Sequence, residues 1–168
     1  MILLDCDLRK GTLHRYLRIP RQLAGITTYL AGDVELPDAI QHFSDLGIDV
    51  MTAGIVPPNP SELLGCEKMG KLLNELTQHY DYVLCDTPPV NAVSDTSVLS
   101  KYADGAILVV SHNKVTRDNV LAAKAQLDAS DTTIFGVVLN MYDAKQTGTD
   151  NTKYYSYYNY NYQYGSYS

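Results

Sequence analysis

Residues 2–11 read ILLDCDLRKG, an apolar run that leads directly into Asp5 and Asp7. Side chains two residues apart in an extended segment point the same way, so both carboxylates should emerge together from the tip of one buried strand. Ligands of open α/β sheets bind at the carboxyl ends of the strands. We therefore expect a functional site where this strand ends.

A second strand should bring a third carboxylate to the same edge, because residues 82–89 read YVLCDTPP and place Asp86 at the end of an apolar run. Three carboxylates at one point repel each other unless a cation joins them. Mg²⁺ suits this role, since it needs only one or two carboxylates plus substrate phosphates. Alternatively, each aspartate only caps the helix or turn that follows it. The two endings together favour nucleotide chemistry.

Short apolar runs alternate with segments of helical period along the chain, which predicts an α/β fold with a mostly parallel sheet flanked by helices. Strands are expected at residues 2–5, 49–53, 82–86, 105–111 and 134–140. One helix should follow Pro60 with Ser61 as its N-cap, and another should begin near Thr116. The apolar positions expected to face inward are Met69, Leu72, Leu73, Leu76, Val120, Ala123 and Leu127. Residues 25–30 could form a shorter helix.

Length and composition predict one soluble globular domain, since 168 residues with 45% hydrophobic content suffice for one core. A net charge of −6 without a cationic cluster argues against nucleic acid as a partner. Cys6, Cys66 and Cys85 fit reduced thiols in the cytosol better than disulfides. The four histidines show no metal-ligand spacing, and we assign them no chemistry.

The composition changes after Ala144, beyond which no aliphatic side chain occurs. We expect a folded domain over residues 1–143 and a flexible tyrosine-rich tail over residues 144–168. The tail tyrosines near the C-terminus are Tyr154, Tyr155, Tyr157, Tyr158, Tyr160, Tyr162, Tyr164 and Tyr167. A flexible segment dense in phenols suits a phosphoacceptor, although such a polar and aromatic tail could instead be a sticky, self-associating one.

Several of these segments resemble the cytoplasmic domain of bacterial tyrosine kinases. Residues 5–11 look like the Walker A′ motif of that family, and residues 82–89 look like its Walker B strand. Residues 53–64, AGIVPPNPSELL, and residues 136–140, GVVLN, are similar to further family segments, and the tyrosine cluster lies where these kinases carry theirs. The resemblance implies a P-loop NTPase-like fold related to MinD/ParA ATPases, which generally lack such a tail.

The resemblance also implies roles for individual residues, with ATP and Mg²⁺ as cofactors. Asp7 and Asp86 would help to hold Mg²⁺, while Asp5 would activate the attacking tyrosine hydroxyl. Arg9 would contact phosphates or a neighbouring subunit, although a solvated charge is the alternative. Thr87 would touch the metal shell or simply form a turn, and Asn140 would read adenine.

The family pattern includes a Gly-x-x-x-x-Gly-Lys-Ser/Thr loop before the first acidic motif, and no segment of these 168 residues has that arrangement. We expect a chain cut short before this loop, without the first strand–loop–helix unit of the fold. A central strand would then lack a neighbour, which predicts poor ATP binding and aggregation.

The resemblance implies a protein-tyrosine kinase that phosphorylates the tail of a neighbouring subunit and so favours dissociation of a ring. Its implied setting is the cytoplasmic face of the bacterial plasma membrane, where it would regulate exopolysaccharide and capsule production. Implied partners are a homo-oligomer, a membrane-spanning activator and a tyrosine phosphatase. The alternatives are a non-catalytic phosphoacceptor or regulatory fragment and a MinD/ParA-like ATPase switch.

Overall fold

The computed structural model describes residues 1–20 and 23–142. The predicted tyrosine-rich tail, with all eight tyrosines between Tyr154 and Tyr167, lies outside the described residues. The description that follows therefore concerns the domain expected over residues 1–143.

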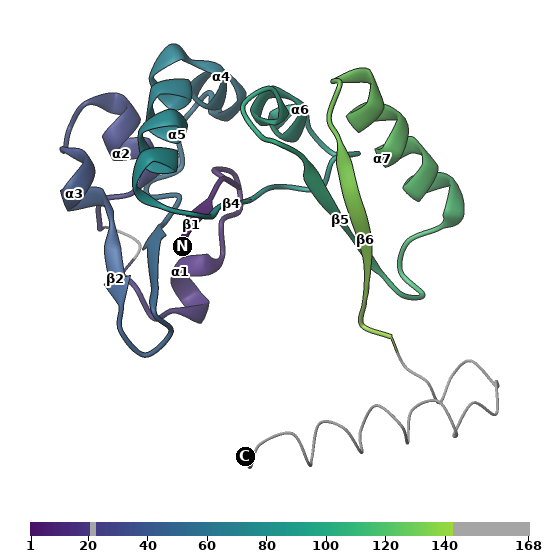
Figure 1. Ribbon diagram of the computed structural model, residues 1–168, viewed down its shortest axis with the longest axis horizontal. Coiled ribbons are helices and arrows are strands. Elements are labelled where there is room, and N and C mark those ends of the chain that lie inside the picture. The colour runs from purple at the N-terminus through teal and green to yellow at the C-terminus, as the bar shows by residue number, and fades with distance from the viewer. Residues whose placement is uncertain (21–22, 143–168) are drawn as a thin grey trace, which may run out of the picture.

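Two separate sheets form the α/β architecture that the sequence predicts (Figure 1). The first has the order β2-β3-β1-β4, in which β1 pairs parallel with both neighbours and β2 pairs antiparallel at the edge. The second contains β5 and β6 in parallel. The strands are β1 Ile2–Asp5, β2 Gln41–Phe43, β3 Ile48–Met51, β4 Val83–Asp86, β5 Ala106–Ser111 and β6 Ile134–Asn140.

Strand β2 belongs to a hairpin that the sequence analysis did not predict. The turn between β2 and β3 contains Gly47 at φ +61°, a left-handed conformation that glycine adopts without steric cost. The hairpin pairs Phe43 with Ile48 and Gln41 with Val50. It adds an antiparallel edge strand to an otherwise parallel sheet.

Seven helices lie within the described ranges: α1 Leu13–Tyr16, α2 Ile26–Ala31, α3 Leu36–Ala39, α4 Pro60–Gly65, α5 Glu67–His79, α6 Asp95–Ser100 and α7 Arg117–Ala129. Helix α7 begins as predicted, because the Thr116 side chain accepts a hydrogen bond from the Asn119 N–H. The prediction for Ser61 was wrong. Asn59 is the N-cap of α4, and Ser61 lies inside that helix, with its hydroxyl hydrogen-bonded elsewhere.

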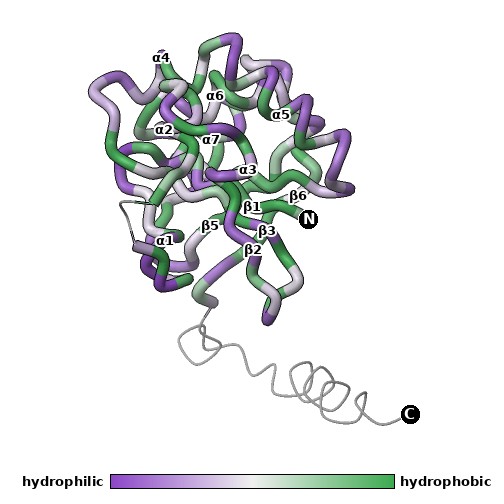
Figure 2. The backbone as a smooth tube through the Cα atoms, turned by 90° about the vertical axis from the view of Figure 1, so that its left-hand side faces the viewer, coloured by the Kyte–Doolittle hydropathy of each residue, from purple (hydrophilic) through white to green (hydrophobic). Residues whose placement is uncertain are grey.

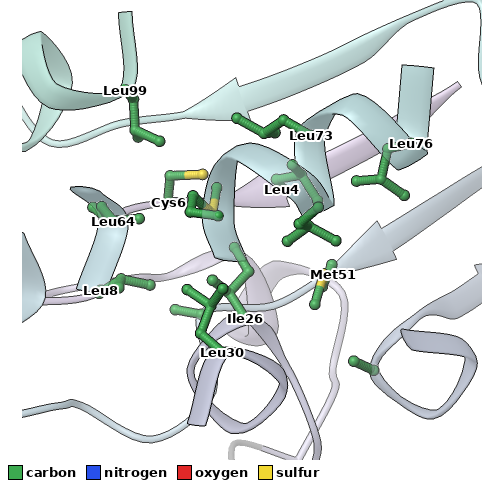
Figure 3. Close-up of a cluster of buried hydrophobic side chains, with 14 of the residues drawn as sticks. Leu4, Cys6, Leu8, Ile26, Leu30, Met51, Leu64, Leu73, Leu76 and Leu99 are labelled. Carbon is green, nitrogen blue, oxygen red and sulfur yellow. The ribbon is translucent and has the colours of Figure 1, made fainter. Parts of the chain in front are cut away.

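The main core lies between the four-stranded sheet and α5, with contributions from α2, α4 and α6. Leu4 of β1 lies among apolar side chains that include Leu73 and Leu76 of α5 (Figure 3). Strand β1 is hydrophobic along its length and runs through the interior of the domain (Figure 2). Burying a leucine of this kind contributes about 1.5–3 kcal/mol.

The second sheet is far less covered, because apolar side chains on both of its faces reach solvent. Ile107 and Val109 of β5 are 60% and 59% exposed, and Val137 of β6 is 60% exposed. Within the described residues, β4 and β5 each have one edge without a strand partner. This arrangement agrees with the expectation of a central strand that lacks a neighbour.

Candidate active site

The carboxyl ends of β1 and β4 bring two of the predicted acidic residues side by side. Asp5 and Asp86 are partners in the parallel register of these strands. The N–H of Cys6 donates to the Asp86 carbonyl at 2.8 Å, so the strands stay paired to their last residues. Asp7 follows two residues after Asp5 on the same rim. We refer to Asp5, Asp7 and Asp86 as the acidic rim.

Asp5 is the buried member of the acidic rim, with no solvent exposure. Its Oδ2 accepts a hydrogen bond from the Leu13 N–H at 3.1 Å, while Oδ1 has no partner among the described residues. Burial raises the pKa of Asp5 to about 6, and the negative charges of Asp86 and Asp7 raise it further. These charge effects indicate that the three carboxylates lie close enough to influence one another.

The approach of the chain to Asp5 depends on a glycine. A Cβ atom at Gly11 would come within 2.7 Å of Asp5 Oδ2 and within 2.8 Å of the Asp7 carbonyl oxygen. Both distances are shorter than real Cβ contacts. The segment after β1 can therefore fold back over the Asp5 carboxylate only because residue 11 has no side chain.

Asp7 is held by the backbone that follows it. Its Oδ1 accepts the N–H of Arg9 at 3.1 Å and the N–H of Lys10 at 2.8 Å. The pKa of Asp86 is raised by loss of water around the carboxyl group and by the nearby charge of Asp7. Two carboxylates that raise each other's energy in this way form a favourable place for a cation.

The acidic rim fits Mg²⁺ as one part of a site. Among residues 1–20 and 23–142, no group of three or more His, Cys, Asp or Glu side chains is arranged to hold a metal ion. Mg²⁺ usually takes one or two carboxylates and completes its octahedron with waters and phosphate oxygens. Asp7 and Asp86, beside the unpaired Oδ1 of Asp5, can supply that smaller share.

The side chain of Arg9 turns away from the rim toward α6. Its Nε donates to Asp95 Oδ2 at 2.8 Å, and its Nη2 donates to Asp95 Oδ1 at 3.1 Å and to Ser61 Oγ at 2.9 Å. Sequence reasoning missed Asp95, which is fully buried. The only sequence signal was an aspartate in a short polar segment, and such residues are common at helix starts.

The other predicted site residues lie at different places. Thr87 directly follows Asp86 and is half-buried. Asn140 ends β6 and thus belongs to the second sheet, where its Oδ1 accepts the N–H of Met141 at 2.8 Å. The structure therefore brings Asp5, Asp7, Asp86 and Thr87 to one rim and leaves Asn140 on another sheet.

The cysteines are free thiols, as the sequence predicts, but they do not all belong to the core. Cys6 is buried, whereas Cys85 is exposed on β4, the strand with the open edge. Within residues 1–20 and 23–142, no helix combines the length and apolar character needed to cross a bilayer.

Known proteins similar to this chain are tyrosine kinases of bacteria. The chain is 34% identical to the putative tyrosine-protein kinase CapB of Staphylococcus aureus over 157 residues, which is 94% of this chain and 67% of CapB. It is 40% identical to the tyrosine-protein kinase Etk of Escherichia coli K12 over 140 residues, or 83% of this chain. That match spans only 19% of Etk. No family model matches the chain.

Solved structures give the same result for the fold. The kinase domain of VpsO superposes with a TM-score of 0.81 at 37% identity, covering 84% of this chain and 70% of that domain. The cell-division ATPase MinD of Pyrococcus furiosus superposes with a TM-score of 0.67 at 22% identity, covering 84% of this chain and 59% of MinD. The MinD likeness concerns the fold alone.

Proposed function

The chain belongs to the bacterial tyrosine kinases, and from this membership we propose that its acidic rim carries the catalytic carboxylates of a domain that transfers the γ-phosphate of ATP to tyrosine. The observation that carries the proposal is the register of β1 and β4, which pairs Asp5 with Asp86 next to Asp7. Three acidic groups so close together, one of them with a raised pKa, are typical of a reactive site.

Asp5 acts as the general base in this proposal. A tyrosine hydroxyl with an ordinary pKa near about 10 is a poor nucleophile at neutral pH unless a carboxylate accepts its proton. With a pKa of about 6, Asp5 is mostly ionised at neutral pH and can still bind a proton. Its unpaired Oδ1 is the atom that would take the proton.

Asp7 and Asp86 hold Mg²⁺ in this proposal. When bound, Mg²⁺ would neutralise charge on the ATP phosphates as the phosphoryl group moves. The hydrogen bonds from Arg9 and Lys10 to Asp7 Oδ1 leave the second carboxylate oxygen of Asp7 available for the ion. Asp86 presents its carboxylate from the end of β4 on the neighbouring strand.

Phosphorylation of the tail supplies the proposed regulation. We expect one subunit to modify the tail tyrosines of the next in a homo-oligomeric ring, with a membrane-spanning activator and a tyrosine phosphatase as partners at the inner face of the plasma membrane. Each phosphate adds about −1.5 to −2 charges, so several of them would push neighbouring subunits apart. The output would be control of exopolysaccharide and capsule export.

A second candidate function is that of a phosphoacceptor modified by another kinase. It is favoured because these 168 residues contain no Gly-x-x-x-x-Gly-Lys-Ser/Thr loop. Mass spectrometry of the tail after incubation with Mg-ATP, alone and with an intact tyrosine kinase, separates the possibilities. Modification of the chain alone supports the kinase, and modification only in company supports the acceptor. No modification in either case favours an ATPase switch of the MinD type.

Nucleotide affinity gives an independent prediction for the 168-residue chain. The backbone N–H cradle and lysine of a phosphate-binding loop contribute much of the binding of ATP in P-loop proteins. We expect isothermal titration calorimetry with Mg-ATP to detect no binding in the micromolar range. Micromolar affinity would instead mean that other residues of this chain supply the phosphate cradle.

A further inference from the structure

The first turn of α6 contacts both loops that carry the acidic rim. Asp95 receives two hydrogen bonds from the guanidinium of Arg9, which lies two residues after Asp7. The next residue, Thr96, donates its hydroxyl to the carbonyl oxygen of Pro88 at 3.0 Å, and Pro88 lies two residues after Asp86. Neighbouring residues of one helix therefore hold the two acidic loops.

The contact to Arg9 has the properties of a designed fixture. Asp95 is fully buried, and a buried carboxylate is stable only when it is paired and hydrogen-bonded. Both of its oxygens are occupied, because Ser61 of α4 also donates its hydroxyl to Oδ1 at 2.5 Å. The hydrogen bond from Arg9, followed by the one from Ser61, lowers the pKa of Asp95 despite its burial. The carboxylate is thus kept ionised between the two helices and the loop.

The fixed guanidinium in turn orients Asp7. Once its side chain is tied to Asp95, the backbone of Arg9 has little freedom to move. The N–H groups of Arg9 and Lys10 are the donors that hold Asp7 Oδ1. A path of direct contacts therefore runs from Asp95 through Arg9 to the carboxylate of Asp7.

We propose that Asp95 is a positioning residue which, together with Arg9, Ser61 and Thr96, fixes the placement of Asp7 relative to Asp86. The inference rests on the proposed function, because the two carboxylates must face one divalent cation. It also changes the role of Arg9, whose guanidinium works through Asp95 and not on a phosphate. Groups that orient metal-binding carboxylates typically affect metal affinity by about 10–100-fold.

The test measures Mn²⁺ affinity of the full 168-residue chain by electron paramagnetic resonance, with far-UV circular dichroism as a check on folding. Asp95→Asn keeps the size of the side chain and removes its charge. We expect it to weaken Mn²⁺ binding by about tenfold while the chain stays folded. Thr96→Val, a milder change that removes the hydroxyl on the Asp86 side, should weaken binding less but measurably.

Rescue distinguishes positioning from general damage. Arg9→Gln should lose as much affinity as Asp95→Asn, and the double variant should lose no more than either single change, because both remove the same contact. Arg9→Lys, which keeps the charge, should recover part of the affinity. Tyr80→Phe, a control that loses a hydrogen bond to Asp49 away from the rim, should bind Mn²⁺ like the unaltered chain.

Asp7→Asn separates failure of this inference from failure of the proposed function. If Asp7→Asn abolishes Mn²⁺ binding and Asp95→Asn leaves it unchanged, the positioning role is wrong while the metal role stands. If Asp7→Asn leaves binding unchanged, or the unaltered chain binds no Mn²⁺, the metal role itself is wrong and the positioning role falls with it. Additive losses in the double variant would also contradict the proposal.

Discussion

The β2-β3-β1-β4 region and the β5-β6 region contain similar apolar strands with opposite exposure. Leu4 of β1 is fully buried, whereas Leu139 of β6 is 53% exposed. Helix α6 lies between the two regions and packs against α4 on one side and α7 on the other (Figure 1). The difference teaches that apolar periodicity identifies a strand in either region, while burial depends on whether other elements cover its faces.

The same contrast extends to the candidate site. The acidic rim belongs to the covered region, where the register of β1 and β4 holds Asp5 next to Asp86. Asn140 belongs to the open region, in which β5 pairs only with β6 among the described strands. The metal-binding side of the proposed reaction thus rests on a packed core, and the adenine side rests on a less covered sheet.

The largest expected effect comes from equal truncations in the two regions. Leu4→Ala leaves a cavity in the core and should lower the free energy of unfolding by about 2–5 kcal/mol. Leu139→Ala removes the same atoms from a half-exposed position and should lower it by less than about 1 kcal/mol. Urea unfolding followed by circular dichroism measures both. Equal losses would mean that β6 is as well packed as β1.

The sequence predicted the strands of both regions well but not the polar links between elements. Residues 2–5 and 134–140 were expected as strands and are observed with those bounds. The β2 strand was missed because QHF is short and mostly polar, and its pairing depends on a turn at Gly47. The acidic rim was predictable because parallel strands end at one edge of a sheet.

Asp95 and Ser61 show why the rest of the site was not predictable. They are distant from Arg9 in sequence, and their contact exists only once α4 and α6 have packed together. Ser61 follows a proline near a helix start, a pattern that favours an N-cap. Tertiary structure instead uses its hydroxyl to hold a buried carboxylate, and local sequence contains no signal for that choice.

An intermediate effect is expected on self-association, which tests whether the open region is sticky. Exposed apolar faces and unpaired strand edges favour contacts between molecules. Val109→Lys places a charge on the exposed face of β5 and should shift sedimentation velocity profiles toward the monomer. Gln78→Lys adds the same charge on α5 in the covered region and should leave them unchanged. Equal effects would point to net charge as the cause.

The smallest effect concerns a polar network at the edge of the covered region. The Tyr80 hydroxyl donates to Asp49 Oδ2 at 2.6 Å, and Nδ1 of His42 lies 2.6 Å from Asp49 Oδ1. Tyr80→Phe removes one of these contacts and should lower the free energy of unfolding by about 1 kcal/mol near neutral pH. Chemical unfolding of both variants at several pH values measures this difference.

The pH dependence of that difference follows from two opposite shifts. Burial and the bond to Asp49 raise the pKa of Tyr80 to about 12, so its stabilising contribution is complete below the ordinary tyrosine pKa of about 10 and is lost as pH rises through 12. Bonds from Tyr80 and His42 lower the pKa of Asp49, so its contribution is present above the ordinary aspartate pKa and disappears as pH falls through the lowered value. The advantage over Tyr80→Phe should therefore be flat around neutrality and shrink at both extremes. An advantage that persists unchanged above pH 12 would show that the hydroxyl contributes nothing through Asp49, and that burial alone stabilises this edge.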